Sequence, residues 1–149
     1  MIVIINGPNL NLLGKREPSI YGTRSIEQVL VDIQRAHIDI HFHYLQSNHE
    51  GDLIDWIQNY GIKAMRQEGD EAIGIVLNAG GYTHTSVALK DAVACAEIPV
   101  VEVHISDISQ REDFRRVSLL TDVCAHSIIG HGTDGYKEAV EWIRERVES

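Results

Sequence analysis

The fold is decided near the start of the chain by an apolar run and the polar segment after it: Ile2-Val3-Ile4-Ile5, then Asn6-Gly7-Pro8-Asn9-Leu10-Asn11-Leu12-Leu13-Gly14-Lys15-Arg16-Glu17-Pro18-Ser19-Ile20-Tyr21-Gly22. A short β-branched run of this kind is typical of a central strand that is buried on both faces. The polar segment is long for a connection in a compact domain, and such loops are usually functional or disordered. Because ligands bind at the carboxyl ends of strands in open α/β sheets, we expect a lid here that carries Arg16 and Tyr21.

Length and composition narrow the class of protein. The chain has 149 residues, of which 44% are hydrophobic, and we expect one domain over residues 1–149. No apolar run approaches the ~18 residues of a membrane span, and the first residues lack the pattern of a secretory signal. Cys95 and Cys124 lie far apart in the sequence, which favours a reducing, cytoplasmic location. The net charge of −9 argues against nucleic acid as a partner. Because no long apolar run is present, we expect no membrane partner either.

The rest of the chain alternates between strand and helix patterns. After residues 2–5, the expected strands are Ile38–Leu45, Ala72–Asn78, Ile98–Ile105 and Val123–Ile129. The expected helices begin at Ser25, with a Ser25 and Gln28 capping box, and cover about Glu50–Met65, Thr85–Ala96, a short helix capped by Ser109 and Glu112, and Asp134–Val147. This alternation predicts a flavodoxin-like α/β fold, a doubly wound five-stranded parallel sheet in the order 2-1-3-4-5, arranged in three α/β/α layers.

Polar residues follow the strands at one edge of this sheet. They occupy residues 6–21 after the first strand, 46–51 after the second, 78–86 after the third and 104–106 after the fourth. Because the carboxyl ends of parallel strands meet at one edge, we expect these segments to converge on a single site.

Other kinds of site fit the sequence poorly. The segment from Gly7 to Lys15 has too many residues for a phosphate loop, and Arg16 stands where that loop needs Ser or Thr. His41 and His43 share a strand face near His37, but solvent-facing strand histidines are commoner than metal ligands, so we expect no metal site.

Two other protein classes share the predicted fold. A flavin-binding electron carrier needs a Ser/Thr-rich loop after the first strand, and residues 8–13 supply none. A receiver-type signalling module needs clustered acids where this chain has Asn6 and Asn78. A flavodoxin-like module that binds a small ligand or a flavin without catalysis is the alternative to an enzyme.

The motifs at the strand ends resemble those of one family, the type II 3-dehydroquinate dehydratases. The resemblance covers essentially the whole chain, and its motifs stand in the same order and spacing. They are Asn6-Gly-Pro-Asn-Leu-Asn-Leu-Leu-Gly, Arg16-Glu-Pro-x-x-Tyr21-Gly, Gln46-Ser-Asn-His-Glu-Gly, Leu77-Asn-Ala-Gly-Gly-x-Thr-His84-Thr-Ser, Glu102-Val-His104-Ile-Ser106 and Arg111-Glu-x-Phe-Arg115.

This resemblance implies a cofactor-free dehydration of 3-dehydroquinate to 3-dehydroshikimate in the shikimate pathway, through an enolate. Removing a proton next to a ketone needs a base, a group that stabilises the enolate, and an acid for the departing hydroxyl. The resemblance implies that Tyr21 is the base, acting as a phenolate, and that His104 is the acid. Arg16, five residues before Tyr21, favours the ionised phenol. Glu102 faces the same side of its strand as His104 and is expected to orient the imidazole.

The resemblance also implies roles for further residues. Asn9 stabilises the enolate through an ordered water, and Asn78 positions the acid and the C1 hydroxyl. The backbone N–H groups of Ile105 and Ser106 bind the substrate carboxylate. The ring hydroxyls are held by His84 and Arg115.

The resemblance also implies that the chain assembles into an oligomer. Asp91 matches a residue that reaches into a neighbouring subunit's site, and the family forms a dodecamer, a tetramer of trimers. We therefore expect a homo-oligomer with a small-molecule substrate. His131 stands where the family more often has an apolar residue, and we expect a packing or interface role for it.

Overall fold

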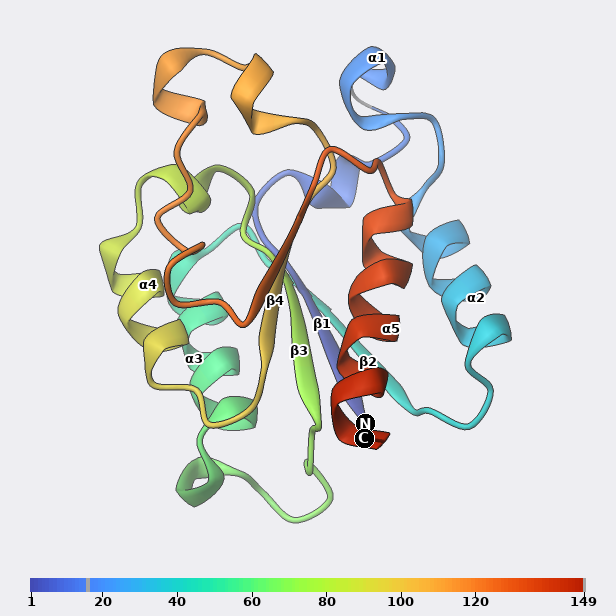
Figure 1. Ribbon diagram of the computed structural model, residues 1–149, viewed down its shortest axis with the longest axis vertical. Helices are drawn as coiled ribbons and strands as arrows, with labels where there is room; N and C mark the ends of the chain where they lie inside the picture. The colour runs from blue at the N-terminus through green and yellow to red at the C-terminus, as the bar shows by residue number, and fades with distance from the viewer. Residues whose placement is uncertain (16, 149) are drawn as a thin grey trace.

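The strands of this protein form one parallel sheet. The computed structural model describes residues 1–15 and 17–148. The strands are β1 (Ile2–Asn6), β2 (Phe42–Gln46), β3 (Gly74–Asn78), β4 (Val100–His104) and β5 (His126–Ile129). Their order in the five-stranded sheet is β2-β1-β3-β4-β5, and all neighbouring pairs are parallel (Figure 1). The predicted sheet and strand order are confirmed.

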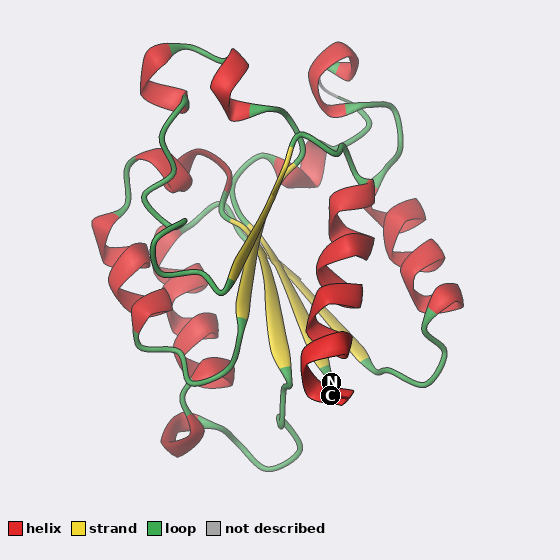
Figure 2. Cartoon of the chain, viewed as in Figure 1, coloured by secondary structure: helices red, strands yellow, loops and turns green. Residues whose placement is uncertain are grey.

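Helices cover both faces of the sheet, which confirms the three-layer arrangement (Figure 2). One face is covered by α2 (Ile26–Ala36) and α5 (Asp134–Glu148), and the other by α3 (Glu50–Gly61) and α4 (Val87–Ala94). Each layer of helices closes a separate hydrophobic core against the sheet. The capping box predicted at the start of α2 is present, with Ser25 and Gln28 bonded reciprocally.

Strand β1 contributes side chains to both hydrophobic cores. All five residues of β1 are buried. Ile2 and Ile4 pack into the core under α2 and α5, whereas Val3 and Ile5 pack into the core under α3 and α4. This alternation follows from the two-residue period of a strand, and it explains why the opening run is apolar at every position.

Several predicted boundaries were wrong by a few residues. Strand β2 begins at Phe42 rather than Ile38, because a turn with a bond from Ile40 N–H to the His37 carbonyl precedes it. Asp39 in this turn is held by Arg144 through two contacts of 2.9 Å. Strand β5 begins at His126 rather than at residue 123.

The helices also end differently from the predictions. Helix α3 ends at Gly61, and residues 63–65 form a separate 3-10 turn, η2 (Lys63–Met65). Helix α4 is shorter at both ends than the predicted Thr85–Ala96, and its cap is Ser86, whose side chain accepts from Leu89 N–H. In place of the short helix capped by Ser109 and Glu112 there are two single turns, η4 (Ile108–Gln110) and η5 (Asp113–Arg115). The side-chain cap of η4 is Asp107, which accepts from Ser109 N–H.

Gly7 is required where the first loop crosses the loop after β3. A Cβ atom at Gly7 would lie 2.5 Å from the backbone oxygen of Ala79. We expect Gly7→Ala to lower the free energy of unfolding by about 2 kcal/mol, because backbone cannot move aside as a side chain can. Gly51→Ala is the control, since a Cβ there meets nothing within 4 Å. Urea unfolding measures the free energy of unfolding of both variants. Equal values for Gly7→Ala and wild type would contradict the close approach of these two loops.

No helix in the described part of the chain is long and apolar enough to cross a membrane.

Candidate active site

A pocket of about 130 Å³ opens at the carboxyl edge of the sheet, among the segments that follow β1, β3 and β4. The convergence predicted from the strand ends is therefore present for three of these segments. The predicted site residues that line this pocket are Asn9, Tyr21, Asn78, His84, His104, Ile105, Ser106 and Arg115.

Tyr21 reaches the pocket from a short helix inside the long opening segment. This segment is more ordered than the predicted loop, because it contains the 3-10 turn η1 (Leu10–Leu12) and the helix α1 (Pro18–Tyr21). Proline suits the first position of a helix, where its missing N–H has no partner to lose. Helix α1 lies above the sheet edge in Figure 1, at the same end as η4 and η5. The predicted partner of Tyr21, Arg16, lies outside the described residues.

Arg111 contacts Tyr21, and sequence reasoning assigned it no role. Its Nη1 donates to the Tyr21 hydroxyl at 3.2 Å and to Ser106 Oγ at 3.2 Å. The guanidinium carbon lies 5.8 Å from the centre of the Tyr21 ring. The hydrogen bond to Tyr21 raises the pKa of Arg111 above its usual value, so the pocket holds a permanent cation beside the phenol oxygen. The motif Arg111-Glu-x-Phe-Arg115 was the available signal, but only its second arginine was given a role.

His104 and Glu102 form a buried pair behind the pocket. The imidazole Nε2 lies 2.8 Å from Glu102 Oε2, and the two residues are 7% and 0% exposed. This contact confirms that they share a strand face, and it leaves Nδ1 of His104 as the nitrogen available to the pocket. Glu102 does not line the pocket itself.

Three hydroxyl groups surround the Glu102 carboxylate on its other sides. Ser118 Oγ donates to Oε2 at 2.8 Å, Ser127 Oγ donates to Oε1 at 2.6 Å, and Thr121 Oγ1 also donates to Oε1. Burial alone would raise the pKa of this carboxyl, but the hydrogen bonds from His104, Ser127 and Thr121 outweigh burial and lower it to about 2. The carboxylate is therefore a fixed negative charge that accepts a hydrogen bond from the imidazole.

This low pKa makes part of the folding stability depend on pH. The folded pKa of about 2 lies below the ordinary value of 4.5, so Glu102 contributes its full stabilisation above pH 4.5 and loses it as the pH falls toward 2. At 1.36 kcal/mol per pKa unit, the complete loss is about 3 kcal/mol, of which about 2 kcal/mol falls between pH 7 and pH 3. Urea unfolding at these two pH values measures that part.

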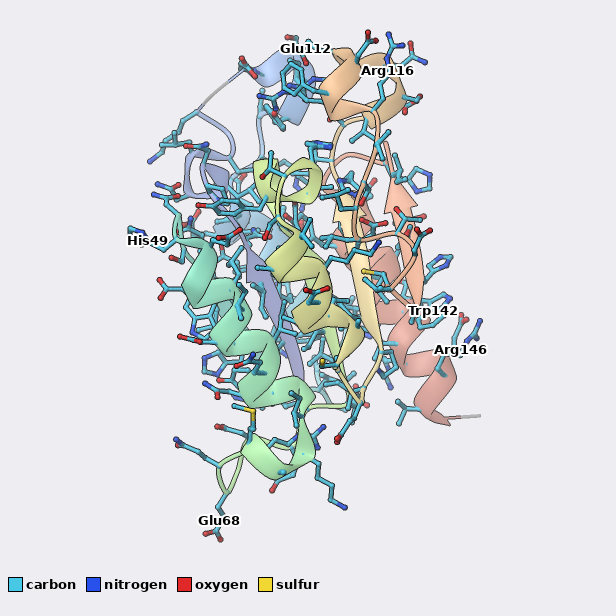
Figure 3. All side chains as sticks on the ribbon, turned by 90° about the vertical axis from the view of Figure 1, so that its left-hand side faces the viewer. His49, Glu68, Glu112, Arg116, Trp142 and Arg146 are labelled. Atoms are coloured by element: carbon cyan, nitrogen blue, oxygen red, sulfur yellow. The ribbon has the colours of Figure 1, made fainter. Side chains whose placement is uncertain are left out.

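Glu102→Gln should weaken this pH dependence. Glu68→Gln is the matched control, because Glu68 is exposed at the opposite end of the molecule (Figure 3). If wild type and Glu102→Gln lose the same stability between the two pH values, Glu102 does not carry the charge described here.

Asn9 is held in an unusual backbone conformation at the pocket rim. Its φ of 69° lies in the left-handed region, which asparagine tolerates better than most residues. Its N–H donates to Asn48 Oδ1 at 3.0 Å. Gln46 Nε2 donates to the same oxygen and to the Gly7 carbonyl, each at 3.2 Å. The segment after β2 thus supports the first loop, although neither Gln46 nor Asn48 lines the pocket.

The remaining pocket residues present fixed polar groups. Nδ1 of His84 carries a proton and donates it to the Val117 carbonyl oxygen, which lies 2.7 Å away. In the neutral ring, Nε2 is then an acceptor. Among the described residues, the N–H groups of Ile105 and Ser106 donate to no backbone carbonyl outside the sheet ladder. The Arg115 Nε lies 3.4 Å from Glu112.

Two predicted residues of interest lie outside this pocket. Asp91 has an exposed side chain on α4 and does not line the pocket of its own chain. His131 forms an exposed hydrogen bond with Glu138, at 2.7 Å from Nδ1 to Oε2. Within residues 1–15 and 17–148, no group of three His, Cys, Asp or Glu side chains is placed to hold a metal.

A flavodoxin-like sheet with an acid–base pair and an arginine-bound phenol at its carboxyl edge defines an α/β enzyme that acts on a small polar molecule. A family model described as "Dehydroquinase class II" matches residues 1–144. The "3-dehydroquinate dehydratase" of Halothermothrix orenii is 48% identical over 145 residues, covering 95% of this chain and 92% of the relative. The protein of the same name from Mesorhizobium japonicum is 44% identical over 149 residues, covering 98% of both chains.

Solved structures agree with these matches. The crystal structure of the type II dehydroquinase from Butyrivibrio crossotus superposes with a TM-score of 0.86 at 41% identity, covering 96% of both chains. The chain belongs to the class II dehydroquinase family, and it is accordingly a hydro-lyase.

Proposed function

We propose that this protein dehydrates 3-dehydroquinate to 3-dehydroshikimate in the shikimate pathway, through an enolate and without a cofactor. The names of the relatives give the substrate and the reaction class. The observation that carries the mechanism is the meeting of three groups in one pocket: the Tyr21 phenol with Arg111, the His104 imidazole, and the backbone of Ile105 and Ser106.

Tyr21 is the base in this proposal. The guanidinium of Arg111 donates a hydrogen bond to the oxygen that acts as the base. The phenolate removes a proton from the carbon next to the ketone. The electron pair of the broken C–H bond moves toward the carbonyl oxygen and gives an enolate. Asn9 acts on that oxygen through an ordered water.

His104 is the acid that completes the reaction. Its Nε2–H donates to Glu102, and the imidazolium carries the second proton on Nδ1. That proton passes to the C1 hydroxyl, the C–O bond breaks, and the enolate electrons form the new double bond as water leaves. Asn78 positions the hydroxyl for this step. The N–H groups of Ile105 and Ser106 bind the substrate carboxylate, and His84 and Arg115 hold the ring hydroxyls.

Absorbance of the conjugated enone product tests this function. Addition of 3-dehydroquinate to the purified protein should produce that absorbance without added metal or cofactor. The absence of any signal from wild-type protein would end the proposal.

We also propose that the protein is a homo-oligomer, with the dodecamer of its family as the expected state. Large apolar side chains are exposed near the pocket: Val87 at 61%, Phe114 at 67% and Val117 at 63%. Val87 stands one helical turn before Asp91 on α4, so a neighbouring chain that covers Val87 also meets that carboxylate. A sedimentation mass near that of one 16.7 kDa chain would contradict this assembly.

A further inference from the structure

A line of buried polar side chains runs beneath the pocket and joins Asn78 to helix α5. Asn78 Nδ2 donates to the Tyr136 hydroxyl at 3.0 Å, and that hydroxyl donates to Asn6 Oδ1 at 2.8 Å. Asn6 Nδ2 donates in turn to the Tyr44 hydroxyl at 3.3 Å. Tyr136 and Asn6 are each 0% exposed, and Asn78 is 5% exposed.

The backbone fixes the direction of every bond in this line. Gly80 N–H can only donate, and it lies 3.2 Å from Asn78 Oδ1, so the oxygen of that amide must face Gly80. The amide nitrogen must then face Tyr136. A hydroxyl that accepts one bond has its own proton free to donate, and Asn6 Oδ1 receives it. The reverse orientation of Asn78 would set its NH₂ against the Gly80 N–H, so that two donors would face each other.

This polarity matters because Asn78 lines the pocket. One N–H of its amide nitrogen is used by Tyr136, and the second remains for a ligand. An amide turned over would offer the pocket the opposite pattern of donors and acceptors. Burial raises the pKa of Tyr136 above its usual value, so its hydroxyl stays protonated and keeps its place in the line.

We propose that Tyr136 is a positioning residue for the dehydration: its hydroxyl holds the Asn78 amide so that an N–H is directed at a substrate oxygen. This inference rests on the proposed function, in which Asn78 positions the departing hydroxyl. Helix α5 touches no substrate in this account. It acts through one hydroxyl, which reaches the pocket by way of Asn78.

Tyr136→Phe tests the inference, because it removes only the oxygen and keeps the ring in the core. We expect kcat/KM to fall about tenfold, with most of the change in kcat, since one hydrogen bond that orients a group in the transition state has about this effect. Tyr44→Phe is the matched control. It removes the hydroxyl at the far end of the same line, and turnover should stay within about twofold of wild type.

A double-mutant cycle separates positioning from a general structural effect. In an Asn78→Ala background, Tyr136→Phe should lower turnover by no more than about twofold, because the group that it orients is absent. A full tenfold loss in that background would overturn the inference. So would wild-type kinetics of Tyr136→Phe itself.

Two further comparisons distinguish a folding defect from a loss of catalytic positioning. Tyr136→Phe leaves Asn6 Oδ1 buried without a donor. If that variant does not fold, the turnover of the double variant Asn6→Leu, Tyr136→Phe is compared with that of Asn6→Leu alone, because neither of these proteins contains the unpaired Asn6 oxygen. If wild type turns over substrate and the double variant is as active as Asn6→Leu alone, only the inference about Tyr136 is overturned. If wild type shows no turnover, the proposed function and this inference are overturned together.

Discussion

Tyr21→Phe is expected to lower kcat on 3-dehydroquinate by about a thousandfold, while the protein keeps its fold. A positioned general base contributes roughly 10²–10⁴ to a rate, and this substitution removes the only atom that accepts the proton. The ring itself packs against the core beneath α2 and α5, and phenylalanine keeps that packing. KM should change little, because the hydroxyl does not hold the substrate in the ground state.

Tyr60→Phe provides the control for Tyr21→Phe. Tyr60 is 8% exposed in the core on the other face of the sheet, so its variant should turn over substrate at the wild-type rate. Urea unfolding of both variants shows that any loss of turnover is chemical. A Tyr21→Phe protein with a kcat within about tenfold of wild type would remove Tyr21 from the role of base.

Arg111→Met is expected to lower kcat by about a hundredfold. Methionine keeps the apolar part of the side chain but loses the charge that lies 3.2 Å from the Tyr21 oxygen. The base then lacks the hydrogen-bond donor beside its oxygen, whereas Tyr21→Phe lacks the oxygen itself, so the loss should be smaller than for Tyr21→Phe. Steady-state measurement of kcat for both variants at one pH checks this order.

Arg35→Met is the matched control for Arg111→Met. Arg35 is exposed in the last turn of α2 and does not line the pocket. Its loss removes the same net charge from the chain and should leave kcat unchanged. Equal effects of the two substitutions would mean that overall charge, not the contact with Tyr21, sets the rate.

The sheet and the edge that carries the pocket were predictable because they depend on local patterns. The all-apolar strand β1 and the polar residues after β1, β3 and β4 are visible in the sequence, and strand order follows from the alternation of elements. The pair of Glu102 and His104 was predictable for the same reason, since the two residues are one strand period apart.

Other side-chain contacts in and beneath the pocket were not predictable, because they join distant parts of the chain. Arg111 is 90 positions from Tyr21, and Tyr136 is 130 positions from Asn6. Ser127 is 25 positions from Glu102, on a strand that sequence patterns place beside β4 without saying which side chains meet. The late start of β2 has a similar cause, because Asp39 is held in a turn before the strand by Arg144, 105 positions away.

The carbonyl of Val117 has a consequence for the design of inhibitors. Because it holds a proton of His84 on Nδ1, the neutral ring offers the pocket a lone pair on Nε2. A compound that presents a hydroxyl or an amine to this nitrogen gains a hydrogen bond. An analogue with an ether or a carbonyl at the same place sets two acceptors against each other and binds less tightly. An inhibitor that binds in this pocket should therefore place a hydrogen-bond donor opposite Nε2 of His84.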